Sequence, residues 1–529
     1  MKNKTIINEL RRSIGYRLAL GVFFQLLLLL VGGLEDWSFA SQVDGFYLFS
    51  ISRENALFLL FSPLAAIIPY ALQFLGDWEQ RIIYHSLHRC GKRAFVSSKI
   101  IATIMSGALA TALGTLLYAL ICICFAPADS KIVEAWRTYG DGTWLEHFFR
   151  SYSGREYMFV CVGLDAIAGS IWSAIALLLS CILRSKVASL LGTAILFFSF
   201  VRIHDLRALY YPSSYYVPTI DQPVKELSDI LITQIVVLCI LCVLIVFFMS
   251  YKLKELGLAK KKKTCSLRLN RYITKNNKWI WITTIFLILI RTLLLDNYQE
   301  SIYEQLLNCM GGIPFEESIN VNSLSQWFLL LLPLIIYNSL LLKNNFSSWR
   351  YMTIHRFGRK KAWLFNIIRK QVMFCLAYVL IQFASVLLWG ACKGTNFDAI
   401  ANNSINGYSS YVGFFICILI IPFLSIHFFV LCCLETSAFF FSKSVTVSAV
   451  IVLLIHAITI VISNYPGTIW NLESNGMLLR SSIFYEEQIP LSLCFLFQTT
   501  MIVLLILLEL FELRGIIAIN HKNGDRTYD

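Results

Sequence analysis

Charged residues are scarce in this sequence. Asp, Glu, Lys and Arg together make up only 15% of its 529 residues, whereas hydrophobic residues make up 57%. Soluble domains have about 25% charged residues, so the composition excludes a soluble fold with a buried core and a charged surface. It predicts an all-α polytopic membrane protein, because helices satisfy their own backbone hydrogen bonds within a bilayer.

Nucleotide-binding and metal-binding motifs are also missing. No Gly-x-x-x-x-Gly-Lys-Ser/Thr sequence occurs, so the chain does not hold nucleotide phosphates in that manner. Most of the 15 cysteines fall in apolar runs, and none of their spacings matches a zinc site. A disulfide between Cys309 and Cys392 is left open. We predict no catalytic residue, no metal site and no cofactor bound by this chain.

Apolar runs long enough to cross about 30 Å of hydrocarbon as helix recur along the whole chain. We count about twelve, near residues 18–33, 57–75, 100–125, 158–183, 187–203, 230–250, 279–295, 326–342, 371–391, 411–434, 445–463 and 491–511. Pro63 and Pro69 predict kinks in the second run, and Pro333 predicts one in its counterpart.

The distribution of charge orients these spans. With both termini in the cytoplasm, the inner segments hold most of the 45 Lys and Arg residues, and the outer segments hold most of the 32 acidic residues. This is the asymmetry that the positive-inside rule describes. The net charge of +13 is therefore a topology signal, and no nucleic-acid partner is needed to explain it.

A short basic segment occurs twice. Residues 84–95 read YHSLHRCGKRAF and residues 351–363 read YMTIHRFGRKKAW, so an aromatic residue, a His-Arg pair, a glycine and two cations recur in the same order. Two ordinary positive loops that fix topology would explain the charge but not this order. We interpret both copies as docking elements for a soluble partner. The residues concerned are His88, Arg89, Gly91, Lys92, Arg93, His355, Arg356, Gly358, Arg359 and Lys360.

Other features repeat in the same order. A very short basic turn separates spans four and five, and another separates spans ten and eleven. A Tyr-Pro pair occurs in the loop before span six and again before span twelve. We therefore predict a tandem repeat of two six-helix units, with residues 1–251 and 279–529 as the halves and residues 252–278 as a basic cytoplasmic linker.

Charges inside spans are costly and usually face a cavity or a partner. Asp165, Arg202 and Arg291 lie within or at the edges of predicted spans, and we take them as candidate pathway residues. For Arg291 a side chain that reaches to the membrane surface is an adequate alternative. His427 and His456 also lie inside apolar runs, as proton sites or as helix-packing residues.

The order of these elements resembles the type-2 permeases of ATP-binding-cassette exporters. The features shared are an amphipathic entry helix at residues 1–17, a basic segment between spans two and three, a tight hairpin between spans four and five, and a Pro-containing outer loop before span six. The resemblance covers nearly the whole chain, twice over, as in the fused permeases of bacterial peptide and antibiotic exporters.

This resemblance implies a location and a mode of action. Residues 79–94 and 346–361 would be coupling helices on a dimer of separate soluble nucleotide-binding ATPase subunits, which bind the ATP and magnesium. The loops at about 204–229 and 465–490 would form outer gates that contain Tyr211, Pro212, Tyr465 and Pro466. The chain would lie in a bacterial plasma membrane and, without being an enzyme itself, export an amphipathic or hydrophobic substrate such as a peptide, an antibiotic or a lipid.

Two other classes remain open. A secondary transporter also shows repeats, but its energy coupling usually needs several ionisable groups at mid-membrane. Here Asp165, His427 and His456 are scattered over three spans. An integral membrane transferase acting at the outer face would need clustered carboxylates, for which only Asp205, Asp221, Glu316 and Glu317 are suitable.

Overall fold

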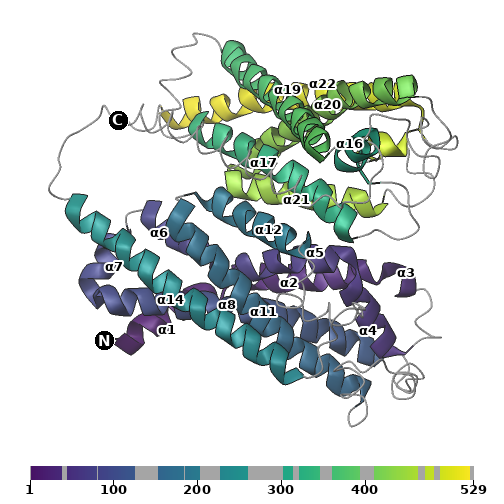
Figure 1. Ribbon diagram of the computed structural model, residues 1–529. Coiled ribbons are helices and arrows are strands. Elements are labelled where there is room, and N and C mark those ends of the chain that lie inside the picture. Colours follow the sequence, from purple (N-terminus) through teal and green to yellow (C-terminus); the bar gives the residue numbers. More distant parts are fainter. Residues whose placement is uncertain are drawn as a thin grey trace. The chain divides into compact units, whose positions relative to one another are not determined.

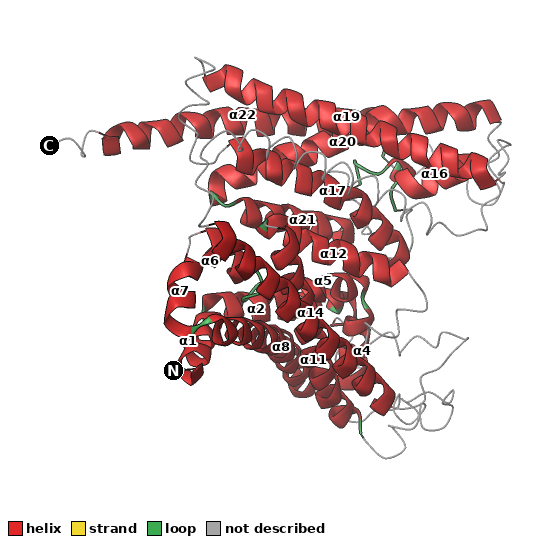
Figure 2. Ribbon diagram, turned by 60° about the vertical axis from the view of Figure 1, so that its left-hand side comes forward, coloured by secondary structure: helices red, strands yellow, loops and turns green. Residues whose placement is uncertain are grey.

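The structure is a computed structural model in which almost every described residue is helical (Figures 1 and 2). It describes residues 2–37, 44–79, 82–125, 153–183, 185–202, 227–259, 302–313, 321–345, 360–393, 410–462, 471–472, 474–481 and 489–524. Within these ranges the only β-type pairing is an isolated bridge between Ser481 and Ile489. The all-helical prediction is confirmed for this part of the chain.

The chain divides into two compact units, Met1–Ser266 and Leu267–Asp529. The helices of the first unit are α1 (Lys2–Ser13), α2 (Tyr16–Gly32), α3 (Leu34–Trp37), α4 (Gly45–Glu54), α5 (Ala56–Ile67), α6 (Gln73–Glu79), α7 (Ile82–Cys90), α8 (Lys92–Phe125), α11 (Gly154–Leu183), α12 (Lys186–Arg202) and α14 (Leu227–Ala259). Those of the second are α16 (Ile302–Met310), α17 (Val321–Asn345), α19 (Lys360–Lys393), α20 (Ser410–Ser442), α21 (Val445–Ile462), the 3-10 helix η2 (Leu478–Arg480) and α22 (Leu491–Gly524).

Seven of these helices are long and apolar enough to cross a membrane. An eighth span arises if Ile6–Ser13 and Tyr16–Gly32, which meet at an angle of 50°, are taken together. Shorter apolar helices cover Leu57–Ile67, Lys186–Ser199 and Val445–Ile460. The span predicted near 279–295 lies outside the described residues. Long apolar helices in this number are what a multi-pass membrane protein requires.

The helix ends correct one local prediction and confirm another. The apolar run at 57–75 is not one helix, because α5 ends at Ile67 and α6 begins at Gln73, with Pro69 in the intervening turn. The kink expected at Pro69 is therefore a complete break. The tight turns are also present, since α11 ends at Leu183 just before α12, and α20 ends at Ser442 just before α21.

Close packing of small residues joins α8 to α11 at the centre of the first unit. A Cβ atom on Gly107 would lie 2.7 Å from the carbonyl oxygen of Gly169, and a Cβ on Gly169 would lie 2.7 Å from that of Gly107. Only glycine permits so short a backbone approach, which is a common way for membrane helices to pack. This contact gives α8 a rigid support along its middle.

Candidate functional site

The first basic segment forms the short helix α7 together with the start of α8. Ile83 is buried, whereas Tyr84, His85, His88 and Arg89 are exposed. An amphipathic helix of this kind lies with its apolar side against the protein and presents its polar side outward. The observed helix lies within the predicted coupling segment 79–94.

The predicted coupling residues of this copy lie together on the surface. His88, Arg89, Gly91, Lys92 and Arg93 are all exposed. None of the cations among them has an ion-pair partner within the described part of the chain. Their charge therefore remains available to a partner.

Gly91 sets the angle between α7 and α8. Its φ of +76° lies in the left-handed region, and its amide donates to the Leu87 carbonyl oxygen at 3.0 Å. This is a common way for a helix to end. Gly91 therefore ends α7, while its counterpart Gly358 lies outside the described residues.

Substitution of Gly91 should reveal this conformation. Gly91→Ala is expected to destabilise the first unit by about 1 kcal/mol, because a β-carbon is strained in the left-handed region. A Cβ atom at this position would have no other atom within 4 Å, so crowding does not contribute. Gly91→Asn is the matched control, since Asn tolerates this region better. Thermal unfolding in detergent measures both, and equal stability of the Ala and Asn variants would contradict the assignment.

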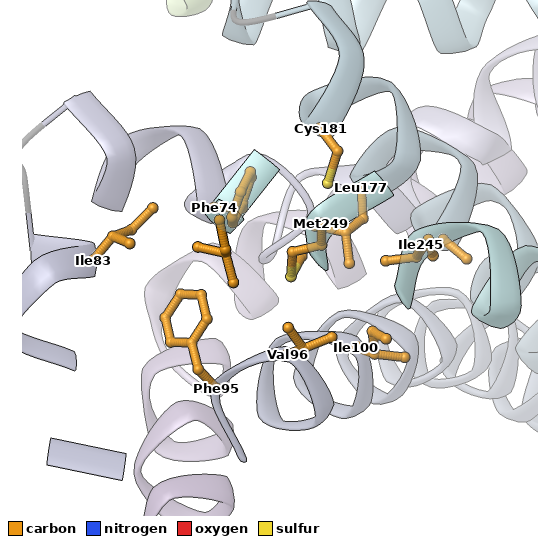
Figure 3. Packing of buried hydrophobic residues seen from close by; sticks show 11 residues of the cluster. Phe74, Ile83, Phe95, Val96, Ile100, Leu177, Cys181, Ile245 and Met249 are labelled. Atoms are coloured by element: carbon orange, nitrogen blue, oxygen red, sulfur yellow. The ribbon is translucent and has the colours of Figure 1, made fainter. Parts of the chain in front are cut away.

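Apolar packing connects α7 to the rest of the first unit. Figure 3 shows Ile83 beside a cluster that includes Phe74 of α6, Phe95 of α8, Leu177 of α11 and Met249 of α14. Ile83 is 1% exposed. Because interiors are close-packed and deform little, a displacement of α7 is transmitted to these helices.

A buried cluster of charges lies at the same end of the unit, where α1, α6 and α7 meet the start of α8 (Figure 1). The Lys99 Nζ atom on α8 lies 2.9 Å from a Glu9 carboxylate oxygen and 2.5 Å from an Asp77 carboxylate oxygen. The Arg12 guanidinium also contacts Asp77, at 2.8 Å. Lys99 donates a further hydrogen bond to the Tyr70 hydroxyl, which in turn donates to Glu9.

Three of the four charges are buried, and the exposed Arg12 balances the second carboxylate, which makes the burial of Lys99, Glu9 and Asp77 tolerable. Lys99 is completely buried and Asp77 is 1% exposed. Burial alone raises the pKa of Asp77, but the hydrogen bond from Arg12 and the charge of Lys99 outweigh it, so that pKa lies below its ordinary value. The cluster fastens α1 to α6 and α8.

The lowered pKa of Asp77 gives a pH prediction. A carboxylate with a depressed folded-state pKa stabilises the fold above its unfolded pKa of about 3.9, and this stabilisation is lost as pH falls through the folded-state pKa. Wild type should therefore exceed Asp77→Asn in melting temperature at pH 7 and at pH 5. The difference should shrink only below about pH 4. A difference that disappears between pH 7 and pH 5 would contradict this assignment.

Asp165, the predicted pathway residue on α11, forms a second buried ion pair. Its carboxylate lies 2.6 Å from the Arg53 guanidinium of α4 and accepts a hydrogen bond from Thr115 of α8 at 2.8 Å. The Arg53 guanidinium carbon also lies 5.5 Å from the centre of the Phe49 ring, within cation-π range. The carboxylate is thus paired within the first unit, and its role in a pathway stays a prediction.

The remaining predicted residues lie mostly outside the described part of the chain. Arg202 and Lys360 are terminal residues of α12 and α19, but their side chains lie outside the described part of the chain. The other residues outside it are His355, Arg356, Gly358, Arg359, Arg291, Tyr211, Pro212, Tyr465 and Pro466. Cys309 and Cys392 are both described, and no disulfide joins them.

Two histidines that are distant in sequence meet inside the second unit. The ring centres of His427 on α20 and His456 on α21 are 6.3 Å apart, and both rings stack on Trp327 of α17. Gly476, in the loop before α22, packs against His427 so closely that a Cβ atom added to the glycine would overlap the imidazole. This loop belongs to the predicted outer gate 465–490. Its Arg480 donates to the Ile313 carbonyl oxygen at 2.9 Å.

Several buried charges are not evident from the sequence. Glu9, Arg53 and Lys99 are absent from the predicted sites, although Lys99 directly precedes an apolar run. Glu435 directly follows one; its carboxylate accepts hydrogen bonds from Asn338, at 3.0 Å, and from Ser339. Charged residues at the ends of hydrophobic runs are the available signal, but their partners come from distant helices.

No family model matches the chain, and no curated protein or solved structure matches it either. Its function must therefore be inferred from its own residues and geometry.

Proposed function

We propose that the chain is the transmembrane permease subunit of an ATP-binding-cassette exporter of a bacterial plasma membrane. A dimer of separate soluble ATPase subunits would bind ATP and magnesium and drive the export of an amphipathic or hydrophobic substrate. The observation that carries the proposal is α7, a short helix whose basic side is exposed and whose apolar side is packed against α6 and α8.

The lengths of the long helices, taken in order over the described part of the chain, support a tandem repeat. In the first unit α8, α11, α12 and α14 have 34, 30, 17 and 33 residues. In the second unit α19, α20, α21 and α22 have 34, 33, 18 and 34 residues. The same long, long, short, long order is expected if one ancestral unit was duplicated.

The buried positions of α8 and α19 also correspond. Placing Phe95 opposite Trp363 aligns further buried residues at a constant spacing: Val96 with Leu364, Thr103 with Gln371, Ala110 with Tyr378 and Tyr118 with Val386. A shared burial pattern over a whole helix indicates that each helix has the same place in its own unit. On this basis we propose twelve spans and two cytoplasmic termini.

The proposed mechanism is alternating access. Closure of the ATPase subunits on ATP would push α7, and the Ile83 packing would carry that motion to α6 and α8. Lys99 of α8 binds the carboxylates of Glu9 on α1 and Asp77 on α6, so α1 would move together with α6 and α8. ATP binding shifts this equilibrium only by the difference in its affinity for the two states.

Cross-linking tests this assignment at a defined place. In a cysteine-free background, Arg89→Cys on α7 should cross-link to a soluble ATPase in membranes of the native host. Arg155→Cys, an exposed residue at the start of α11, is the matched control and should capture none. Equal capture by both positions, or capture by neither with the complex intact, would contradict docking at α7.

The same two positions test the topology. An impermeant thiol reagent added to intact cells should label Arg155→Cys and spare Arg89→Cys, because α7 faces the cytoplasm in the twelve-span arrangement. Permeabilised cells should show labelling at both positions. Labelling of Arg89→Cys in intact cells would rule out the proposed orientation.

A secondary transporter remains the second candidate, and one observation favours it. His427 and His456 lie together beside Trp327, although the sequence separates them by a span boundary. Two adjacent imidazoles could carry protons during transport. Such a carrier would retain transport in vesicles without ATP, whereas the proposed exporter would not.

A further inference from the structure

The second unit contains a pocket that the proposed export cycle does not use. It has a volume of about 390 Å³ and is lined by Tyr337 of α17 and by Asn366, Arg369, Lys370, Met373 and Phe374 of α19. Ligand pockets generally have volumes of roughly 300–1,000 Å³. The pocket is therefore large enough for a small polar headgroup.

The cations of this pocket have no acidic partner in the described part of the chain. Neither α17 nor α19 contains an Asp or Glu residue. All of the ion pairs found there belong to the first unit. Arg369 and Lys370 therefore present two positive charges to whatever occupies the pocket. Guanidinium and ammonium groups beside amide and hydroxyl donors form a set that binds phosphate oxygens well.

The surroundings of Arg369 point to a lipid. Phe365, Val372, Met373, Leu376 and Leu380 are exposed apolar residues of α19. They lie four, three, four, seven and eleven positions from Arg369, which places them all on its side of the helix. A molecule held at Arg369 by a phosphate would thus lie along a continuous apolar stripe.

The depth of the pocket is also suitable. The candidate span Trp363–Cys392 has 30 residues, or about 45 Å of helix, which equals the thickness of a bilayer with its headgroups. Arg369 lies roughly 9 Å from the Trp363 end, near the boundary between headgroups and hydrocarbon. Val372, Leu376 and Leu380 continue from there toward the membrane centre.

From this geometry we infer that the pocket between α17 and α19 binds an anionic phospholipid. Arg369 and Lys370 hold the phosphate, Asn366 and Tyr337 contact the polar headgroup, and the acyl chains follow the apolar stripe of α19. Basic pockets between membrane helices on the cytoplasmic side are known to bind anionic headgroups. This inference does not depend on the proposed export function.

Native mass spectrometry of the full chain, purified with phosphatidylglycerol or with phosphatidylcholine, tests the site. The wild type should retain phosphatidylglycerol and not phosphatidylcholine. Arg369→Gln with Lys370→Gln should reduce this retention about tenfold or more. Lys92→Gln with Arg93→Gln removes the same charge from an exposed segment and should leave retention within about twofold, since single exposed ion pairs contribute little binding energy.

Two further experiments distinguish binding in a defined pocket from general electrostatic attraction of an anionic lipid. Asn366→Phe fills the pocket but keeps both cations, and it should also lose phosphatidylglycerol. Phosphatidylglycerol should raise the melting temperature of the protein. Glycerol 3-phosphate, which has the headgroup chemistry without acyl chains, should not. Retention in Asn366→Phe, equal losses in the two double variants, or an equal shift with glycerol 3-phosphate would each overturn the inference.

Discussion

Lys99→Met is expected to lower the free energy of unfolding of the first unit by about 3–5 kcal/mol, because it leaves two buried carboxylates without their shared cation. Glu9 would lose its ion pair with α8, and Asp77 would keep only Arg12. For a unit of this size the melting temperature should fall by roughly 10 °C. Thermal unfolding in detergent, followed by tryptophan fluorescence, measures the change.

The matched control removes the charge of Lys99 together with the charges of its two acidic partners, Glu9 and Asp77. Lys99→Met combined with Glu9→Gln and Asp77→Asn leaves no buried carboxylate in the cluster, and the new amide oxygens can still accept the hydrogen bonds that Tyr70 and Arg12 donate. The triple variant should therefore recover most of the lost stability. If it is as unstable as Lys99→Met alone, the loss comes from packing of the lysine side chain and the electrostatic account is wrong.

Charge reversal in the docking segments is expected to have the largest effect on assembly. Lys92→Glu with Arg93→Glu should weaken ATPase association about tenfold or more, because like charges across an interface are strongly unfavourable. Both residues are exposed, so the chain should still fold and insert. Arg155→Glu, at the start of α11, is the control and should leave association unchanged.

The second docking segment should be the more sensitive one. Between Lys343 and Lys370 the sequence contains no acidic residue, whereas the first segment carries Glu79 and the adjacent Asp77. Asp77 is already held by Lys99 and Arg12. We therefore expect Arg359→Glu with Lys360→Glu to weaken ATPase association more than Lys92→Glu with Arg93→Glu does. Association through the second segment should also be more salt-dependent. Pull-down of the ATPase over a salt series measures both, and equal losses would show that the difference in charge serves only topology.

Local features of the fold can be predicted from the sequence because they depend on nearby residues. Hydropathy reports the transfer energy of a single segment, so the predicted spans lie near the observed long helices α8, α11 and α20. The turn at Ser185 and the left-handed Gly91 also depend on a few neighbouring residues. At Pro69 the sequence predicts only a kink, whereas the structure has a full break beside Tyr70, whose hydroxyl accepts a hydrogen bond from the distant Lys99.

The partners of the buried charges cannot be predicted in this way, because they are set by tertiary packing. Asp165 is recognisable as an unusual charge, but its partner Arg53 falls between predicted spans. The Lys99 cluster joins residues of α1, α6 and α8 that are far apart in the chain. Nothing in the local pattern around Glu9 shows that it meets Lys99, and the same holds for the meeting of His427 with His456.

The alignment of α8 with α19 shows where the two units differ. Lys99 falls opposite Ile367, which is also completely buried, so the position that holds the cation of the first unit is apolar in the second. The second unit instead has Arg369 and Lys370 beside an open pocket. If the two units arose by duplication, as we propose, they have since diverged: in the first, ion pairs hold the entry helix, and in the second, the proposed lipid site occupies the corresponding helix.

Purification of the tagged chain from its native host, with ATPase activity measured across the eluted fractions, tests the central claim most directly. We predict that soluble ATPase subunits co-elute at two per chain, that the complex hydrolyses ATP, and that the isolated chain does not. Absence of any ATPase from the purified protein, together with substrate transport by vesicles without ATP, would contradict the proposal and identify the chain as a secondary carrier.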